Sequence, residues 1–330
     1  MSSNSTGPGR VFRPSYDTCS AIGVSDICPV RATTIGYYPN EGVNAFLAAG
    51  FGLCTVVTLV IGIWKRTWSY SLAVAAGCAL ELAGYASRVA LSSNPWNSSA
   101  FKTQIVAIIL GPTLICIGLY LTLKHAVKAI NPSLSRVSPH LYPLFFIPAD
   151  VSCLVIQAIG GGLAAAGGHE DMKLLQNGNR MIIAGIVLQV VVLGVFGLLA
   201  GEYLFRVRKW IANGPAPEEA KGAALWRNTK FRMFVYGMMG AYATLFIRCV
   251  YRIAEMAGGW GNHIMQDEPS FVVLESFMVL IASCLLAGFA PGIFFPQMAG
   301  RGEEVQKAVS EGGRTDGELS GADAEKRVSR

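Results

Sequence analysis

The sequence predicts an all-α integral membrane protein, a seven-transmembrane-helix bundle with its N-terminus outside and its C-terminus cytoplasmic. Three observations predict this fold: charge depletion, recurring long apolar runs, and a lysine and arginine asymmetry between alternate loops. Charged residues make up only 15% of the 330-residue chain and hydrophobic residues 52%. Because soluble domains carry about a quarter charged residues, this composition argues against a soluble fold.

Seven apolar runs are long enough to cross a bilayer as helices, since about 20 residues rising 1.5 Å each span the hydrocarbon core. They are too long and too uniformly apolar for the alternating strands of a membrane barrel. They lie between an extracellular N-terminal tail of residues 1–42 and a polar, disordered cytoplasmic tail of residues 298–330. Within the membrane domain of residues 43–297 we place the spans at 43–64, 70–91, 101–127, 141–166, 180–205, 231–257 and 270–297.

Two of these runs need justification beyond length. The fifth, RMIIAGIVLQVVVLGVFGLLAGEYLF, is the clearest span, and residues 206–230 after it form the longest loop. The sixth contains three charged residues and is the weakest by hydropathy. We count it because Phe234 to Val250 is otherwise apolar and because an even number of spans would break the loop charge pattern.

The charge pattern predicts the orientation, because cytoplasmic loops of membrane proteins are enriched in lysine and arginine. With the N-terminus outside, the cytoplasmic loops hold twelve such residues and the outer loops only three, Lys102, Lys173 and Arg180. The twelve are Lys65, Arg66, Lys124, Lys128, Arg136, Arg206, Arg208, Lys209, Lys221, Arg227, Lys230 and Arg232. This asymmetry also accounts for the net charge of +6, so no nucleic-acid partner is expected.

The outer side carries two kinds of candidate modification. Asn4 and Asn97 each begin an Asn-x-Ser/Thr sequon, and both fall outside in this topology, which makes them glycosylation candidates. Cys19 and Cys28 lie in the outer tail, where an oxidising environment favours a disulfide. The other cysteines lie in spans as small apolar residues, and the four histidines are scattered. No metal site and no cofactor are predicted.

Charged and amide side chains inside the spans are the candidate functional residues. A charge near a helix centre costs roughly 2.5–3.5 kcal/mol, so such residues face the bundle interior and pair. Glu81 and Arg88 are seven residues apart, as are Asp150 and Gln157, which places each pair on one helix face. The candidates for binding a headgroup or a coupling proton are Glu81, Arg88, Asp150, Gln157, Arg248, Arg252, Glu255 and Glu275.

Their depths suggest a polar funnel that opens outward and closes near mid-membrane. Arg88, Gln157, Arg248, Arg252, Glu255 and Glu275 fall in the outer half of their spans, joined by Gln104 and Gln189, and Glu81 and Asp150 lie nearer the middle. The competing interpretation is a charge network that only fixes helix register and packing. Snorkelling of the outer arginines to lipid headgroups is a further alternative.

The order of several motifs resembles one family. They are GYYPNEGVNAFLAAGFGL, ELAGYASR, the spacing Gln104-x7-Pro112-x7-Tyr120, ADVSCLVIQAIGGG, and IRCVYRIAEMAGG followed by Glu268 and Glu275. Over about residues 36–297 the chain resembles the fungal lipid-translocating exporter family, seven-helix proteins that include sphingoid long-chain base and 7-aminocholesterol resistance proteins. The chain departs from the family at Ala290-Pro291-Gly292, where many relatives would have His-Pro-Gly.

The resemblance implies a multi-pass fungal protein, most simply of the plasma membrane, that exports lipids or toxic amphiphiles and supports lipid homeostasis and stress or drug resistance. By matching motif it also marks Gly84 beside seven of the candidates above, all except Glu275. Its partners would be membrane lipids or amphiphilic small molecules. With no Walker A motif in the sequence, a gradient, a partner or the lipid's own distribution would supply the energy.

The alternative is a seven-helix sensor that regulates lipid asymmetry or the stress response without transport. The third span ends LYLTLKHAV without Asp-Arg-Tyr, and the seventh ends APGIFFPQM without Asn-Pro-x-x-Tyr, so an ordinary G-protein-coupled receptor is disfavoured. An enzyme is not expected, because the sequence shows neither a paired-histidine metal site nor a Ser/His arrangement.

Overall fold

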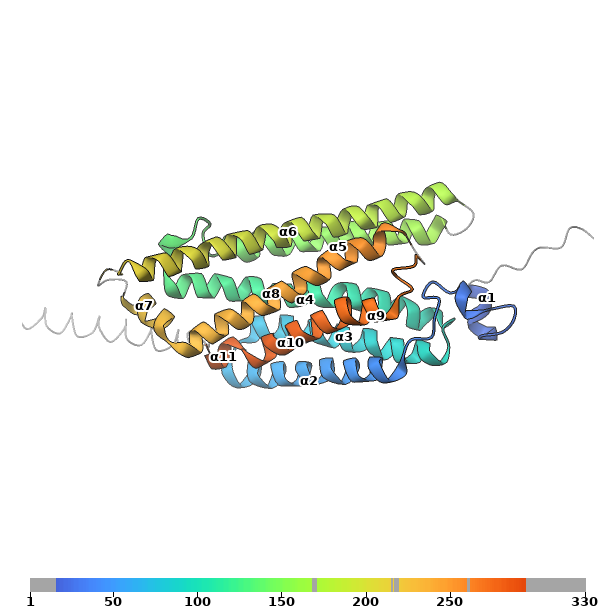
Figure 1. Ribbon diagram of the computed structural model, residues 1–330, viewed down its shortest axis with the longest axis horizontal. Helices are drawn as coiled ribbons and strands as arrows, with labels where there is room; N and C mark the ends of the chain where they lie inside the picture. Colours follow the sequence, from blue (N-terminus) through green and yellow to red (C-terminus); the bar gives the residue numbers. More distant parts are fainter. Residues whose placement is uncertain (1–15, 168–170, 215, 217–219, 260–261, 295–330) are drawn as a thin grey trace, which may run out of the picture.

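The computed structural model describes residues 16–167, 171–214, 216, 220–259 and 262–294, and its regular elements in these ranges are all helical. Seven helices are long and apolar enough to cross a membrane, which confirms the predicted seven-helix bundle (Figure 1). The first six are α2 (Glu41–Lys65), α3 (Trp68–Ser93), α4 (Ser98–Ile130), α5 (Leu141–Gly167), α6 (Met172–Ala212) and α8 (Thr229–Ala257). The seventh crossing, Glu268–Phe294, comprises α9 (Glu268–Phe271), η4 (Val272–Phe277), α10 (Met278–Gly288) and α11 (Pro291–Phe294).

Side-chain caps define where several long helices begin. Asn40, Asn97 and Asn228 each accept a backbone N–H of the first turn, and Asp171 accepts two. A cap of this kind satisfies donors that the helix itself leaves unpaired. The cap at Asp171 starts α6 eight residues before the predicted span, and α6 also continues past it to Ala212. Apolar composition marks only the part of a helix that lipid surrounds, so the polar turns at both ends were missed.

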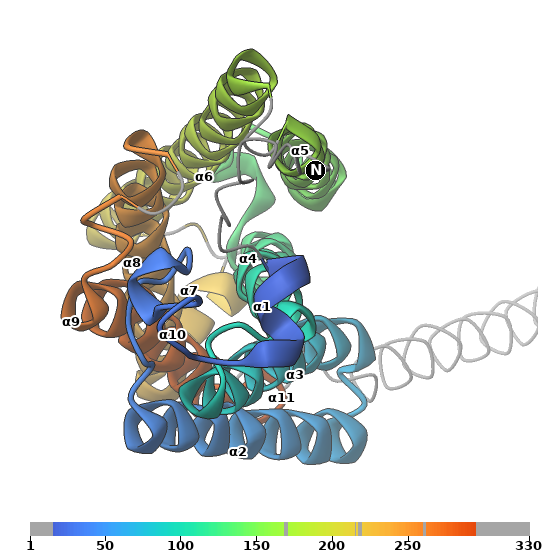
Figure 2. The same ribbon diagram turned by 90° about the vertical axis from the view of Figure 1, so that its right-hand side faces the viewer.

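Consecutive helices pack side by side and alternate in direction. α3 lies between α2 and α4, α5 pairs with α6, and α8 packs against α6 and α10. Seen along the bundle, α2 and α3 lie opposite the α5 and α6 pair, with α4 and α8 between them (Figure 2). We call the end of the bundle beside α1 (Tyr16–Ile22) the α1 end, and the opposite end beside α7 (Ala220–Arg227) the α7 end (Figure 1).

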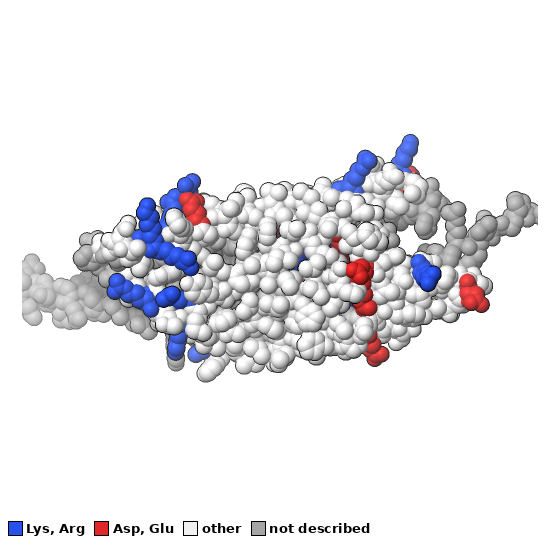
Figure 3. Space-filling view, in the orientation of Figure 1, with Lys and Arg blue, Asp and Glu red and all other residues white. Residues whose placement is uncertain are grey.

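The surface has the distribution expected of a membrane protein. Large apolar side chains are exposed along the helices, including Leu53, Trp64, Leu198 and Phe205, each at least 66% exposed. Contiguous exposed apolar surface of this kind is rare on soluble monomers. Lysine and arginine gather at the α7 end, and a broad uncharged band covers the middle (Figure 3).

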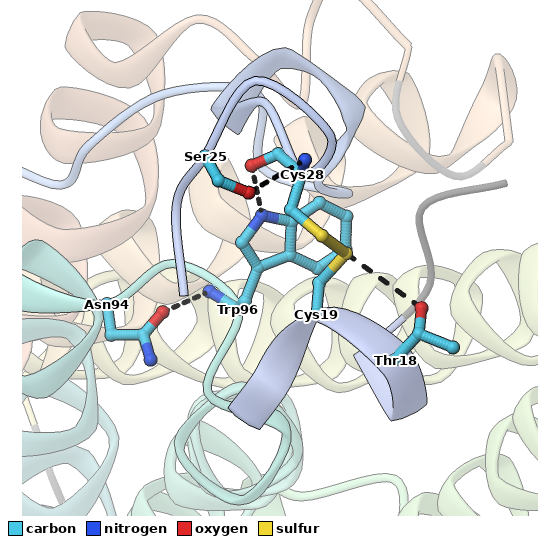
Figure 4. Close-up of a disulfide and its surroundings, with 6 residues drawn as sticks. All are labelled: Thr18, Cys19, Ser25, Cys28, Asn94 and Trp96. Carbon is cyan, nitrogen blue, oxygen red and sulfur yellow. Dashed lines mark hydrogen bonds between the residues drawn. A yellow bond between two sulfur atoms is a disulfide. The ribbon is translucent and has the colours of Figure 1, made fainter. Parts of the chain in front are cut away.

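A small folded unit covers the α1 end. The structure joins Cys19 and Cys28 by a disulfide, and the indole of Trp96 lies against it and donates to the Cys28 carbonyl at 3.0 Å (Figure 4). Tyr16 of α1 stacks on Phe101 of α4. The sequon residue Asn97 is the N-cap of α4, Asn4 lies outside the described residues, and glycosylation of both stays a prediction. The predicted tail of residues 298–330 also lies outside them.

Removal of the disulfide by Cys19→Ser with Cys28→Ser is expected to loosen this unit without unfolding the bundle. Cross-linking a loop with a sequence separation of 9 stabilises the unit by about 2–3 kcal/mol in the chain-entropy account. The expected result is a red shift of the Trp96 contribution to the fluorescence, measured as the difference between each protein and its Trp96→Phe counterpart, because five other tryptophans also fluoresce. An unchanged spectrum would show that aromatic packing alone holds the unit.

Candidate functional site

The eight predicted site residues all point into the bundle. Seven of them are buried, with Glu81 and Glu275 0% exposed, and the Arg252 side chain is only 12% exposed. Gln104 and Gln189 are buried as well. Snorkelling to headgroups therefore does not describe the arginines here, because their charged groups bond inside the bundle.

Arg88 forms a polar layer near the α1 end. Its Nε donates to Asn44 Oδ1 at 2.9 Å, and Nη2 donates to the Tyr37 hydroxyl at 3.0 Å. Glu268 Oε1 lies 3.8 Å from the same Nη2 and also accepts the Asn40 N–H. The ring of Phe271 covers the guanidinium at 4.3 Å. This layer therefore ties α2 and α3 to the start of the seventh crossing.

Arg252 and Glu255 form an ion pair in the last turns of α8, also toward the α1 end of the bundle. Arg252 Nη1 donates to Glu255 Oε2 at 2.5 Å, three residues further along the helix, as the spacing predicts for helical neighbours. The Asn262 side chain donates to the Glu255 carbonyl at 2.6 Å. The pair thus lies where α8 ends and the chain turns back.

Arg248 and Glu275 form the most buried ion pair, one turn deeper. Arg248 Nε donates to Glu275 Oε1 at 2.7 Å, and Nη2 lies 2.6 Å from the same oxygen and donates to the Ile108 carbonyl at 2.9 Å. Glu275 belongs to η4, a π-helical segment of Val272–Phe277. Short π-helical segments occur often at functional sites. The pair links α4, α8 and the seventh crossing.

Glu81 is fully buried without a hydrogen-bond partner. Neither carboxylate oxygen has one among the described residues. The side chain fits only because α4 has a glycine opposite, since a Cβ at Gly111 would lie 2.5 Å from Glu81 Oε1. Gly111 is three residues from Ile108 along α4, so Glu81 lies one turn from the Arg248 contact without bonding to it.

An amide chain crosses the middle of the bundle. Gln157 Nε2 donates to Gln189 Oε1 at 3.1 Å, and Gln189 Nε2 donates to Thr113 Oγ1 at 3.3 Å. These glutamines, Arg248 and Arg252 line a cavity of about 10 Å³, room for about one water molecule. The predicted funnel is therefore wrong for this conformation, because the long polar side chains bond to one another and fill the space between the helices.

Asp150 lies toward the α7 end. Its Oδ2 accepts the Tyr120 hydroxyl at 2.7 Å, whereas Oδ1 has no partner among the described residues. The Tyr120 ring packs against Phe146 and Phe196. The carboxylate is thus held by a neutral donor in aromatic surroundings.

Among the described residues, the buried carboxylates outnumber the buried arginines that could pair with them. Each buried arginine has a glutamate partner: Arg88 with Glu268, Arg248 with Glu275, and Arg252 with Glu255. Glu81 and Asp150 form no ion pair in the described part of the chain, although Arg248 and Arg252 lie near enough to attract the charge of Glu81. A group of three or more possible metal ligands does not occur there either. The arrangement is suited to a cationic group.

Several partners were not selected from the sequence. Tyr37 and Asn44 lie in the GYYPNEGVNAFLAAGFGL motif and Tyr120 in the Gln-Pro-Tyr spacing, so those motifs contained the signal. Glu268 was noted as a motif residue but not as a partner of Arg88. The Ile108 carbonyl could not be found from residue type, because any residue offers a carbonyl and only the helix packing presents this one.

The chain matches one protein family and several yeast proteins. Residues 74–298 match the family described as RTA1 like protein. Sphingoid long-chain base transporter RSB1 of Saccharomyces cerevisiae is 28% identical over 283 residues, covering 79% of this chain and 74% of that protein. Protoporphyrin uptake protein 1 of the same yeast is 26% identical over 223 residues, covering 66% and 67%.

A third yeast relative, Protein RTM1, is 25% identical over 234 residues, covering 70% of this chain and 69% of that protein. No solved structure matches. The family match covers well over half of the chain and includes all eight site residues. The chain therefore belongs to the RTA1-like protein family, as its motifs indicated.

Proposed function

We propose that this protein exports amphiphilic lipids or toxic amphiphiles that have a cationic headgroup and an apolar tail. The relatives support a transport role, since one is a sphingoid long-chain base transporter and another a protoporphyrin uptake protein. Export of this kind would contribute to lipid homeostasis and to stress or drug resistance. The proposal favours transport over catalysis.

The observation that carries the proposal is the pair of unmatched carboxylates. A buried ionised group is costly unless it is paired, and among the described residues Glu81 and Asp150 form no ion pair, with Glu81 attracted to Arg248 and Arg252 only at longer range. Either a proton or the ammonium of a bound lipid would supply the missing partner. Exchange between the two would couple headgroup binding to proton movement.

The closed interior fits an occluded state of a transporter. The cavity beside Arg248 and the glutamines is too small for a headgroup, so entry requires separation of helices. The α5 and α6 pair contacts the rest of the bundle mainly through α4 and α8. Movement of this pair away from α4 would break the hydrogen bond from Gln189 to Thr113, while the bond between Gln157 and Gln189 lies within the pair.

We place the α7 end in the cytoplasm and the α1 end, with its disulfide, outside a fungal plasma membrane. The basic α7 end supports this orientation (Figure 3). The competing function is a sensor that regulates lipid asymmetry without moving lipid. In such a sensor the same ion pairs would hold the helices in one arrangement.

Reconstitution of the purified protein in liposomes tests the proposal. Movement of a fluorescent sphingoid base between leaflets is expected to be faster than in protein-free liposomes, and faster for the amine than for its N-acetylated, uncharged form. Equal rates with and without protein would contradict transport and favour the sensor function. Equal rates for the two lipids would contradict recognition of the cationic head.

A further inference from the structure

A second, larger pocket lies at the α7 end, outside the buried network. It has a volume of about 470 Å³ and is lined by Arg208 and Ile211 of α6, Trp226 and Arg227 of α7, and Arg232 and Tyr236 of α8. Volumes of about 300–1,000 Å³ are typical of small-molecule sites. Unlike the cavity near Arg248, this pocket has room for a whole headgroup.

Its chemistry favours phosphate. Three of the six described lining residues are arginines, and none of these six is acidic. None of the three arginines forms an ion pair within the described part of the chain. Guanidinium groups bind phosphate through paired, charge-assisted hydrogen bonds. An ordinary phospholipid diester offers one negative charge, whereas a phosphomonoester offers about 1.5–2 and three acceptor oxygens.

The pocket is partly organised before any ligand binds. Arg208 Nη2 donates to the Tyr236 hydroxyl at 3.3 Å, and its guanidinium lies 6.0 Å from the centre of the Tyr236 ring. Trp226 is buried and packs edge-to-face on Phe231. These contacts hold α6, α7 and α8 around the arginines.

The surroundings favour a lipid over a soluble ligand. Phe205, three residues before Arg208 on α6, is 70% exposed, and Met239, three residues after Tyr236 on α8, is 45% exposed. Each therefore lies about one helical turn from a lining residue, on the side toward mid-bundle. Basic pockets between transmembrane helices on the cytoplasmic side are suited to anionic headgroups. A headgroup among the arginines would leave its acyl chains beside these two apolar side chains.

We propose that Arg208, Arg227 and Arg232 form a binding site for a lipid whose headgroup carries a phosphomonoester, separate from the buried carboxylates that serve export. The amine-binding proposal above and this site involve opposite charges, so one does not depend on the other. Binding here would join α7, which packs against α4 and α8, to Arg208 of α6.

Native mass spectrometry of the full-length protein in detergent tests the site. With phosphatidylinositol 4-phosphate as the probe, binding is expected to exceed that of phosphatidylinositol by about tenfold or more. The triple change Arg208→Gln, Arg227→Gln and Arg232→Gln should abolish the preference. The matched control replaces Lys128, Lys209 and Lys230 by Gln, because these exposed lysines lie at the same end but do not line the pocket.

The control separates a pocket from general attraction between charges. Equal loss of binding in the two triple variants would overturn the site. Soluble inositol 1,4-bisphosphate binding as tightly as the lipid would overturn the assignment to a lipid. Thermal unfolding checks that the variants fold, and if the triple variant does not, Arg232→Gln alone should still weaken binding more than Lys230→Gln.

Discussion

Arg248→Gln is expected to destabilise the protein by about 3–5 kcal/mol, the loss typical of breaking a buried ion pair by removing one partner. Glu275, which is 0% exposed, would then keep its charge with no basic partner at bonding distance. The Ile108 carbonyl would lose its donor as well. In thermal unfolding of the purified protein in detergent, the midpoint should fall on the order of 10 °C.

A double substitution tests whether the unpaired charge of Glu275 causes this loss of stability. Arg248→Gln together with Glu275→Gln removes both charges and should recover most of the midpoint, because paired amides can hydrogen-bond without a burial cost for ions. Arg252→Gln is the matched control. Its pair is partly exposed and joins two residues of one helix, so a smaller loss is expected. Failure of the double change to recover stability would place the role of Arg248 in its contact with α4 instead.

The fold and the inward direction of the charged residues followed from the sequence for physical reasons. A helix in lipid needs a long apolar run, and a charge within that run must avoid lipid. Glu81, Asp150 and Arg248 could therefore be placed in the interior from residue type and spacing alone. The pair of Arg252 and Glu255 is of the kind that a three-residue spacing on one helix allows.

Pairings between helices did not follow, because they depend on helix rotation and depth in three dimensions. Glu81 and Arg88 share a face of α3, yet Arg88 bonds to Asn44 and Tyr37, and Glu81 has no hydrogen-bond partner in the part of the chain that the structure describes. Among the described residues the charged side chains of the bundle interior form three ion pairs, and two further carboxylates form none. The predicted funnel was wrong for a related reason. The spacing of residues along a helix gives the helix face on which each one lies, but not how far its side chain extends into the space between helices.

The α7-end pocket shows the same limit. The sequence places Arg208, Arg227 and Arg232 together in the group of basic loop residues, with lysines that prove to lie outside the pocket. Composition therefore explains why this end of the molecule is positively charged. The pocket itself depends on the short helix α7, which packs against α4 and α8 and brings Trp226 and Arg227 beside the lining residues of α6 and α8.

Glu81→Gln is expected to abolish movement of the sphingoid base while leaving the protein as stable as before, or more stable. A purely structural charge network predicts the reverse pattern, since removing a member that holds helices together lowers stability. Glu81 has no hydrogen-bond partner to lose among the described residues, and a neutral amide of the same shape removes the cost of a buried charge. Functional sites commonly sacrifice stability in this way.

The decisive comparison is therefore transport against thermal midpoint for the same variants. Glu41→Gln is the matched control, because Glu41 is exposed in the first turn of α2 and should change neither quantity. Asp150→Asn should also lose transport, with some loss of stability because the carboxylate accepts the Tyr120 hydroxyl. Glu81→Gln could lower the thermal midpoint as Arg248→Gln does, with transport falling only in proportion to the amount of folded protein. That result would assign Glu81 to the charge network that holds the helices together. If transport is lost at an unchanged midpoint, the unmatched carboxylate is where the cationic head binds.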